Sequence, residues 1–191
     1  MAEGFISRVE RLHAYPEFAI THAGEQVLVA AKAKEIARRQ PHHELGGRLS
    51  SWLREQGRIT WENIQLTIAR PEGGRRAVRP DVFSLATTYD AKRINPCVHE
   101  VKVSRADFLS DLAKPEKREG YSAFCEQFFY VAPPGIIERA ELPPNCGLLV
   151  ERSESDFEVV VRPRRREVHL GVHEFMNLLL KPGTFNPLGS T

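Results

Sequence analysis

Cysteines are scarce in this sequence, and long apolar runs are absent from it. The chain has only Cys97, Cys125 and Cys146, which are far apart and form no CxxC pair. An odd number of dispersed cysteines argues against a disulfide framework and against a zinc ribbon. No run of about 18 apolar residues is present, so we expect no membrane-spanning segment. The charged residues near the N-terminus do not suit a signal peptide, and we therefore expect a soluble, cytoplasmic protein.

The sequence also lacks an excess of charge of either sign. Its 191 residues include 27 Lys and Arg and 25 Asp and Glu, for a net charge of +2. This balance excludes a basic tail or a histone-like coat, which binds nucleic acid through a large positive charge. With 41% hydrophobic and 27% charged residues, the composition is that of an ordinary globular protein. The length suits one domain with an appended element.

Helical and alternating patterns follow one another along the chain. Apolar residues three to four apart predict helices, and strict alternation predicts strands. The predicted helices are 24–41, which Pro41 ends, 42–57, 104–114, 115–127 and 171–183. The predicted strands are 58–69, 81–90, 97–103, 128–134, 146–152 and 157–163, and 70–80 is predicted to be a loop rich in Gly, Pro and Arg.

This order of elements predicts a mixed α/β fold, a small β-sheet flanked by α-helices. Residues 1–24 lack strong periodicity and are interpreted as an N-terminal arm. We assign the core to residues 25–150. The remainder, 151–191, is interpreted as C-terminal strands and a helix that pack on this core.

Two acidic residues and a lysine are expected to meet at one edge of the sheet. Glu100 and Lys102 alternate with valines, so they share one face of the predicted strand 97–103. The connection from the preceding strand is short, which predicts an antiparallel hairpin. That hairpin would bring Asp81, at the start of strand 81–90, toward the end of strand 97–103.

Such a set of residues suits the cleavage of a phosphodiester bond. Carboxylate oxygens are the ligands that Mg²⁺ or Mn²⁺ prefers. The metal polarises the phosphate and lowers the pKa of a bound water. A lysine ammonium can orient that water and stabilise the charge that develops at phosphorus. The alternative is a surface ion pair between Glu100 and Lys102, which contributes about 0–1 kcal/mol and has no function.

The residues Pro80 and Asp81, a hairpin, and then Glu100, Val101 and Lys102 resemble the PD-(D/E)XK nuclease superfamily. The stretches RPDVFSL, HEVKVSRADFLSD, LAKPEKREGY and FCEQFFYVAPP are similar to the MmcB-like DNA repair family, a Holliday-junction-resolvase-like branch. The resemblance covers roughly residues 25–150 and implies a restriction-endonuclease-like core. It also implies that Asp81 and Glu100 bind the metal, with the Val101 carbonyl as a third ligand, and that Lys102 is the catalytic lysine. Glu44 and Glu62 are candidates for an additional acidic position.

Further residues around this motif are candidates for contact with DNA. They are Arg79, Ser104, Asp107, Asp111, Lys114, Lys117 and Tyr121. Arg79 closes the arginine-rich loop beside Asp81, where we favour contact with phosphate. For Asp107 and Asp111 a solvated helix face is an equal alternative, and for Tyr121 simple core packing is favoured over catalysis. For a second arginine cluster, 164–166, contact with phosphate and a solvated loop tip remain open.

Three hypotheses follow from the sequence. The first is a metal-dependent deoxyribonuclease of DNA repair or processing, which the resemblance links to branched or damaged DNA. Resolution of a DNA junction needs two active sites, so this hypothesis includes a homodimer. The second is a non-catalytic nucleic-acid-binding module on the same fold, and the third is a protein-interaction scaffold.

Overall fold

The computed structural model describes residues 4–9, 17–69 and 74–181, which belong to two compact units, 1–41 and 42–191. The first unit contains an antiparallel pair of strands, β1 (Ile6–Val9) and β2 (Glu17–Ile20), and the first part of helix α1 (His22–Glu55). The predicted arm, 1–24, therefore contains a two-stranded sheet. The division into units falls after residue 41 instead of residue 24.

Helix α1 runs through Pro41, so the prediction that proline ends a helix there is wrong. An interior proline removes one backbone donor and costs about 3 kcal/mol. Before Pro41 the helix consists largely of strong helix formers such as Ala, Lys and Glu. After it, Leu45, Leu49 and Leu53 are buried at helical spacing, and their packing holds the second half of the helix.

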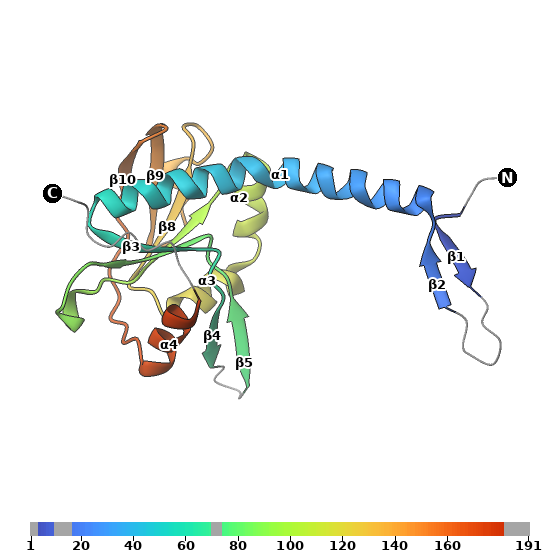
Figure 1. Ribbon diagram of the computed structural model, residues 1–191. Coiled ribbons are helices and arrows are strands. Elements are labelled where there is room, and N and C mark those ends of the chain that lie inside the picture. Colours follow the sequence, from blue (N-terminus) through green and yellow to red (C-terminus); the bar gives the residue numbers. More distant parts are fainter. Residues whose placement is uncertain (1–3, 10–16, 70–73, 182–191) are drawn as a thin grey trace. The chain divides into compact units, whose positions relative to one another are not determined.

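The second unit is built on a six-stranded mixed sheet (Figure 1). The strand order is β10-β9-β8-β7-β6-β3, in which β7, β8 and β9 are parallel to one another and the other neighbours are antiparallel. The strands are β3 (Arg58–Glu62), β6 (Val82–Ala86), β7 (Cys97–Val101), β8 (Gln127–Ala132), β9 (Cys146–Ser153) and β10 (Asp156–Val161). The mixed α/β fold predicted from the sequence is confirmed.

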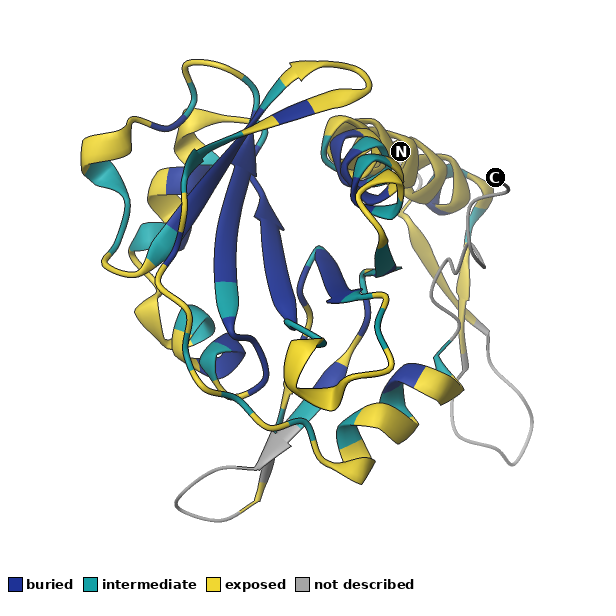
Figure 2. Ribbon diagram, turned by 90° about the vertical axis from the view of Figure 1, so that its left-hand side faces the viewer, coloured by how far each residue is buried: buried dark blue, intermediate teal, exposed yellow. Residues whose placement is uncertain are grey.

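Hydrophobic layers cover both faces of this sheet, and the central strands are buried between them (Figure 2). On one face, the leucines of α1 pack against β-strand residues such as Val82, Val101 and Val131. On the other face lie the helices α2 (Arg105–Leu112), α3 (Pro115–Ser122) and α4 (Val172–Leu180). Each contributes one buried residue to that second layer: Phe108, Tyr121 and Leu178.

The segment 58–80 differs from its prediction. The single strand expected over 58–69 is interrupted at Asn63, whose φ of 51° is incompatible with an extended strand. Its second half is β4 (Leu66–Ala69), which pairs with β5 (Arg75–Val78) in a separate two-stranded sheet. The expected loop 70–80 therefore contains a strand, and within it Arg70 lies outside the described residues.

The C-terminal part of the chain belongs to the same sheet as the core. Strand β9 crosses residue 150, so the predicted boundary there cuts through a central element. Short 3₁₀ turns at Ala91–Arg93 and Arg139–Glu141 lie in the connections. In the second arginine cluster, Arg165 is not a free loop tip, since its guanidinium pairs with Glu126 at 2.5 Å.

Candidate active site

The register of the β6–β7 hairpin brings the predicted acidic residues together. Val82 pairs with His99, so Asp81, one residue before Val82, lies beside Glu100, one residue after His99. The Val101 N–H donates a hydrogen bond of 2.8 Å to Asp81 Oδ2. The antiparallel hairpin and the convergence of Asp81 on the end of β7 are thus confirmed. His99 lies on the opposite face, where it stacks on Phe129.

Glu100, Lys102, Asp111 and Lys117 form a buried charge cluster at the end of β7. Lys102 Nζ lies 3.1 Å from Glu100 Oε1 and 3.2 Å from Asp111 Oδ1. Lys117 Nζ also donates to Glu100 Oε1 and lies 3.5 Å from Asp111 Oδ1. The side chains of Glu100 and Lys102 are only 2% and 4% exposed. The interpretation of the pair as a solvated surface ion pair is therefore wrong.

Asp111 is held in the buried charge cluster by the elements around it. Tyr130, on β8, donates a hydrogen bond of 2.7 Å to Asp111 Oδ2. Arg118, on α3, donates to the Asp111 carbonyl at 2.9 Å. Asp111 is itself buried, so the solvated helix face that was an alternative for it is excluded. Its position, with both oxygens facing protein cations or a phenol, suits a residue that holds Lys102 more than one that contacts DNA.

His42 approaches Asp81 from α1. Its Nε2 lies 3.1 Å from Asp81 Oδ1, the oxygen that the Val101 N–H does not use. The hydrogen bond to Asp81 raises the pKa of His42 above its ordinary value. Burial alone would raise the pKa of Asp81, but the hydrogen bond from His42 and the charge of Lys102 bring it below its ordinary value. Asp81 is therefore an ionised carboxylate at neutral pH.

The pKa values of Glu100 and Lys102 are both raised, but for different reasons. Burial, together with the charge of Asp81, raises the pKa of Glu100 above its ordinary value. Burial would lower the pKa of Lys102, but Glu100 and Asp111 more than offset this and raise it. Lys102 is thus a charged ammonium at neutral pH. The two carboxylates Asp81 and Glu100 have pKa values that are displaced in opposite directions, a pattern typical of catalytic pairs.

The remaining predicted contacts lie around this centre at different depths. Asp107 is partly exposed, with Oδ1 4.0 Å from Lys102 Nζ, while Ser104 caps α2 by accepting a hydrogen bond from the Asp107 N–H. Lys114 is exposed between α2 and α3, and among the described residues no ion pair joins its side chain to the buried charge cluster. Tyr121 is buried and packs in the core as expected, with its hydroxyl donating to the Arg79 carbonyl at 3.0 Å.

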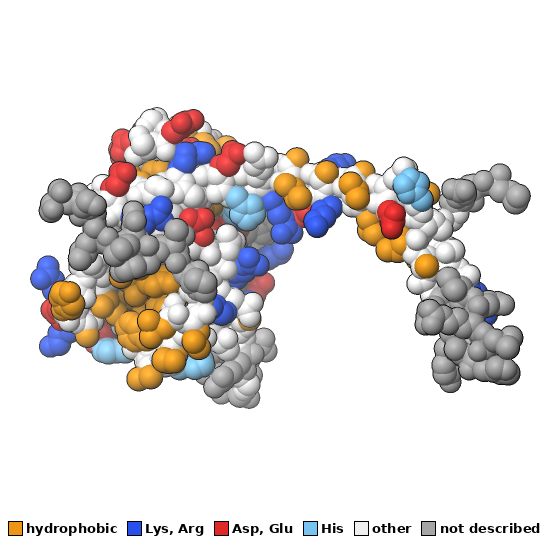
Figure 3. Space-filling view, viewed as in Figure 1, with side chains coloured by type: hydrophobic (Ala, Val, Ile, Leu, Met, Phe, Trp, Pro, Cys, Tyr) orange, Lys and Arg blue, Asp and Glu red, His pale blue; other side chains and the backbone are white. Residues whose placement is uncertain are grey.

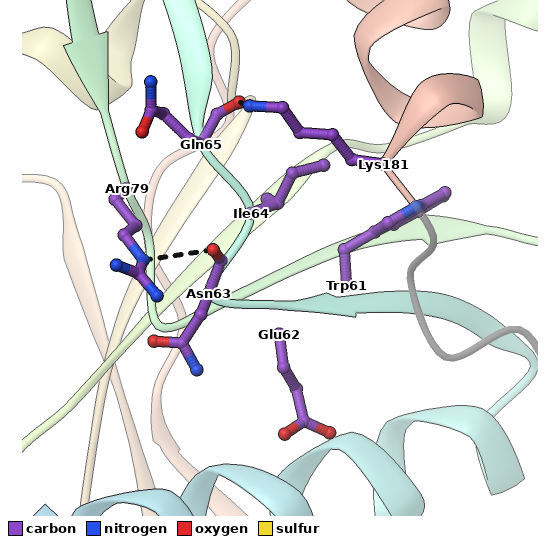
Figure 4. A pocket seen from close by; sticks show the side chains of 7 residues that line it. All are labelled: Trp61, Glu62, Asn63, Ile64, Gln65, Arg79 and Lys181. Atoms are coloured by element: carbon purple, nitrogen blue, oxygen red, sulfur yellow. Dashed lines mark hydrogen bonds between the residues drawn. The ribbon is translucent and has the colours of Figure 1, made fainter.

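A pocket of about 310 Å³ adjoins the Asp81 segment (Figure 4). It is lined by Trp61, Glu62, Asn63, Ile64, Gln65, Arg79 and Lys181. The exposed side chain of Arg79 points into this region, where its Nε donates to the Asn63 carbonyl at 3.1 Å. Trp61 and Glu62 lie on opposite sides of β3. Glu62 pairs with Val82 and is therefore near Asp81. Glu44 lines another pocket, with Arg48 and Trp52.

The carboxylates of Asp81 and Glu100 at the end of β7 are candidate ligands for a divalent cation. Among the described residues, no three His, Cys, Asp or Glu side chains are grouped so that they could hold a metal ion. A Mg²⁺ site, however, commonly uses one or two carboxylates and retains several waters. Glu100 Oε2 is buried and has no hydrogen-bond partner among the described residues. The Tyr121 phenol lies close to Glu100, but its single proton is donated to the Arg79 carbonyl. A carboxyl oxygen that no donor reaches in the described part of the chain, in a side chain that neighbours the ionised Asp81, is a candidate ligand for Mg²⁺ or Mn²⁺.

Two residues of this site were missed from the sequence. His42 lies three and seven residues before Leu45 and Leu49, a spacing that places it on the buried face of α1 and could have identified it. Tyr130 reaches Asp111 because β8 is parallel to β7 with Tyr130 opposite Glu100. No sequence signal specifies that pairing, since the register of non-adjacent strands depends on the whole fold.

Comparisons with known proteins support the fold and leave the activity open. No protein-family model matches the sequence, and no curated protein matches it either. Among solved structures, a protein of unknown function from Silicibacter pomeroyi is similar, with a TM-score of 0.52 and 24% sequence identity over 71% of this chain and 79% of that chain. At this level of identity the similarity shows the fold alone. The chain thus has a mixed α/β architecture, and no helix in its described part is long and apolar enough to cross a membrane.

Proposed function

We propose that this chain is a metal-dependent nuclease of the PD-(D/E)XK type, close to the MmcB-like DNA repair family, that hydrolyses phosphodiester bonds in DNA. The observation that carries the proposal is the meeting of Asp81 and Glu100 at the end of β7, with Lys102 at 3.1 Å from Glu100. A surface ion pair would not need burial, a second carboxylate or a histidine partner.

The residues of the chain have distinct roles in this proposal. Asp81, Glu100 and the Val101 carbonyl would hold Mg²⁺ or Mn²⁺, which polarises the phosphate and supplies a water of lowered pKa. Lys102 keeps its charge and stabilises the negative charge that develops at phosphorus. Asp111 and Tyr130 position Lys102, and His42 holds Asp81 Oδ1 in place. Arg79 is exposed two residues before Asp81, where its guanidinium can contact the DNA backbone.

Branched or damaged DNA is the substrate class that the family resemblance suggests. Resolution of a four-way junction would require two such sites, and in that case a homodimer. Cys97, Cys125 and Cys146 are all free thiols, which suits the reducing cytoplasm.

Cleavage assays test this proposal directly. Supercoiled plasmid, single-stranded DNA and a four-way junction are incubated with the protein and Mg²⁺ or Mn²⁺. We expect Glu100→Gln and Lys102→Met to lose at least about 100-fold in rate while DNA binding is kept, because each removes a charge that acts in the transition state. Asp156→Asn, at an exposed position on β10, is the matched control. A folded wild-type protein that cleaves none of these substrates would refute the proposal.

A non-catalytic DNA-binding module is the second candidate, and one observation favours it. Glu100 and Asp111 are already neutralised by Lys102 and Lys117, so the buried charge cluster is balanced without a metal. Under this alternative, DNA binding is independent of Mg²⁺ and no cleavage occurs. The same assays separate the two candidates.

A further inference from the structure

The charge balance at Glu100 poses a problem for any metal that binds there. Glu100, Asp111 and the neighbouring Asp81 carry three negative charges. The ammonium groups of Lys102 and Lys117, in contact with Glu100 and Asp111, carry two positive charges. Arg118 Nη1 adds a further positive charge 3.7 Å from Asp111 Oδ2. A divalent cation would therefore bring an excess of positive charge into a buried site, which is strongly unfavourable unless one resident cation leaves.

Lys117 is the cation that is able to leave. Its side chain is 36% exposed, whereas that of Lys102 is 4% exposed. Lys102 directly follows β7, and its backbone N–H is bonded to the Val131 carbonyl at 2.8 Å. Lys117 lies instead on the short helix α3, and its ammonium is 5.8 Å from the centre of the Tyr121 ring, at the boundary with solvent. A flexible four-carbon stem lets such an ammonium exchange one partner for another without movement of the backbone.

We infer that Lys117 is a displaceable counterion of Glu100, which a divalent metal replaces and whose released ammonium then contacts a phosphate of the bound DNA. This inference rests on the proposed metal-dependent function. It assigns to Lys117 two states, one bonded to Glu100 and one turned toward the substrate. It also explains why Glu100 bonds to two lysines through Oε1, while its buried Oε2 has no hydrogen-bond partner in the described part of the chain.

The first half of the inference, that a metal displaces Lys117 from Glu100, is tested by measuring metal affinity in the absence of DNA. Mn²⁺ binding is measured by isothermal titration calorimetry for the wild type and for Lys117→Met. We expect the variant to bind Mn²⁺ about tenfold more tightly or better, since a unit charge a few ångströms from the metal is removed. Lys117→Gln is a second neutral variant, in case the methionine is not tolerated. Lys92→Met, at an exposed position in the β6–β7 connection, deletes the same charge far from the site and should leave the affinity unchanged. Glu100→Gln should abolish binding.

The release of Lys117 can be observed in the wild-type protein. An amine-reactive reagent is applied with and without Mn²⁺, and the labelling of Lys117 and Lys92 is quantified by mass spectrometry. We expect Mn²⁺ to increase the labelling of Lys117 and to leave that of Lys92 unchanged. In the cleavage assay, Lys117→Met should then be about 100-fold slower than wild type at saturating Mn²⁺, because the contact with phosphate is lost.

The outcomes distinguish failure of this inference from failure of the proposed function. Equal Mn²⁺ affinity in wild type and both Lys117 variants, with binding lost in Glu100→Gln, would overturn the role of Lys117 and leave the metal site standing. Labelling of Lys117 that does not respond to Mn²⁺ would have the same meaning. Absence of Mn²⁺ binding in the wild type and in every variant would overturn both.

Discussion

Asp111 should contribute strongly to the stability of the fold, because it joins three buried or partly buried polar side chains. It lies 3.2 Å from Lys102 Nζ and 3.5 Å from Lys117 Nζ, and it accepts a 2.7 Å hydrogen bond from Tyr130. The substitution Asp111→Asn keeps the shape of the side chain and removes its charge. It therefore isolates the electrostatic part of these interactions.

The expected loss of stability in Asp111→Asn follows from the burial of Lys102. Removal of one partner from a buried ion pair costs about 3–5 kcal/mol. In Asp111→Asn, Glu100 remains as a partner of Lys102, and the asparagine still accepts a hydrogen bond from Tyr130. We therefore expect the low end, a loss of about 3 kcal/mol in the free energy of unfolding. For a chain of this size, that corresponds to a decrease in Tm of about 6–12 °C.

Urea unfolding at a series of pH values measures both the size and the origin of this effect. Burial would raise the pKa of Asp111, but Tyr130 and Lys102 bring it below its ordinary value of 3.8. A lowered pKa in the folded state means that the contribution is fully present above pH 3.8 and is lost as the pH falls through the folded pKa. The difference between wild type and Asp111→Asn should therefore shrink in acid, while Asp156→Asn should match wild type throughout. A loss below about 1 kcal/mol at pH 7, or one that acid leaves unchanged, would refute this account of the cluster.

Other predictions concern the scaffold. Burial lowers the pKa of His99 well below 6.5, so its contribution to stability is complete above pH 6.5. Below pH 6.5 the free energy of unfolding should fall by about 1.4 kcal/mol per pH unit. Urea titrations should show this slope lost in His99→Gln and kept in the exposed control His169→Gln. In Gly147→Ala, the new Cβ would lie 2.6 Å from Phe129, and we expect thermal unfolding to reveal a destabilisation of about 1–3 kcal/mol. Gly47→Ala, in helix α1 with no neighbour within 4 Å of the new Cβ, should instead stabilise the protein by about 0.5–1 kcal/mol.

The parts of the site that depend on adjacent elements could be predicted from the sequence. Alternation around Glu100 and the short connection before it are local signals, and they were sufficient to bring Asp81 to the end of β7. Ser104, at the start of the predicted helix 104–114, caps α2, because its hydroxyl accepts a hydrogen bond from a backbone N–H of the first turn. Pro115 begins α3 as expected, since the first position of a helix needs no N–H donor.

The residues Asp107, Asp111, Lys114 and Arg118 have helical spacing in the sequence, and whether they form one face depends on whether Pro115 breaks the helix. Helix α2 ends at Leu112, so Lys114 lies beyond it and does not follow the face that Asp107 and Asp111 share. On that face Asp111 is buried, whereas Asp107 is partly exposed. The difference arises because Asp111 is hydrogen-bonded to Tyr130 of the neighbouring strand β8. A pattern of charges predicts which residues are neighbours on a helix, but not how deep they lie.

Errors in the fold occurred where a single residue changes the backbone or where distant packing overrides a local preference. Asn63 adopts a positive φ and separates β3 from β4. The alternation of apolar residues shifts by one position there, from Ile59 and Trp61 to Ile64 and Leu66. Pro41 is a local signal for a helix end that the strong helix formers before it and the leucine packing after it outweigh. The contact between Tyr130 and Asp111 depends on the parallel pairing of β7 with β8, which lies beyond the reach of any local pattern.

Stability alone is a poor explanation for the buried charge cluster. Buried ion pairs are often replaceable by hydrophobic residues at no cost to stability, so a chain gains little by burying them for that purpose. A purely structural pair would also satisfy both oxygens of its carboxylate, whereas Glu100 binds two lysines through Oε1 and leaves Oε2 without a donor among the described residues. Glu100 also interacts with a second, ionised carboxylate, that of Asp81, and with Lys117, whose side chain is 36% exposed. Such an arrangement is expected if the site exchanges one cation for another. It is the strongest reason to measure metal binding by the chain before its enzymatic activity.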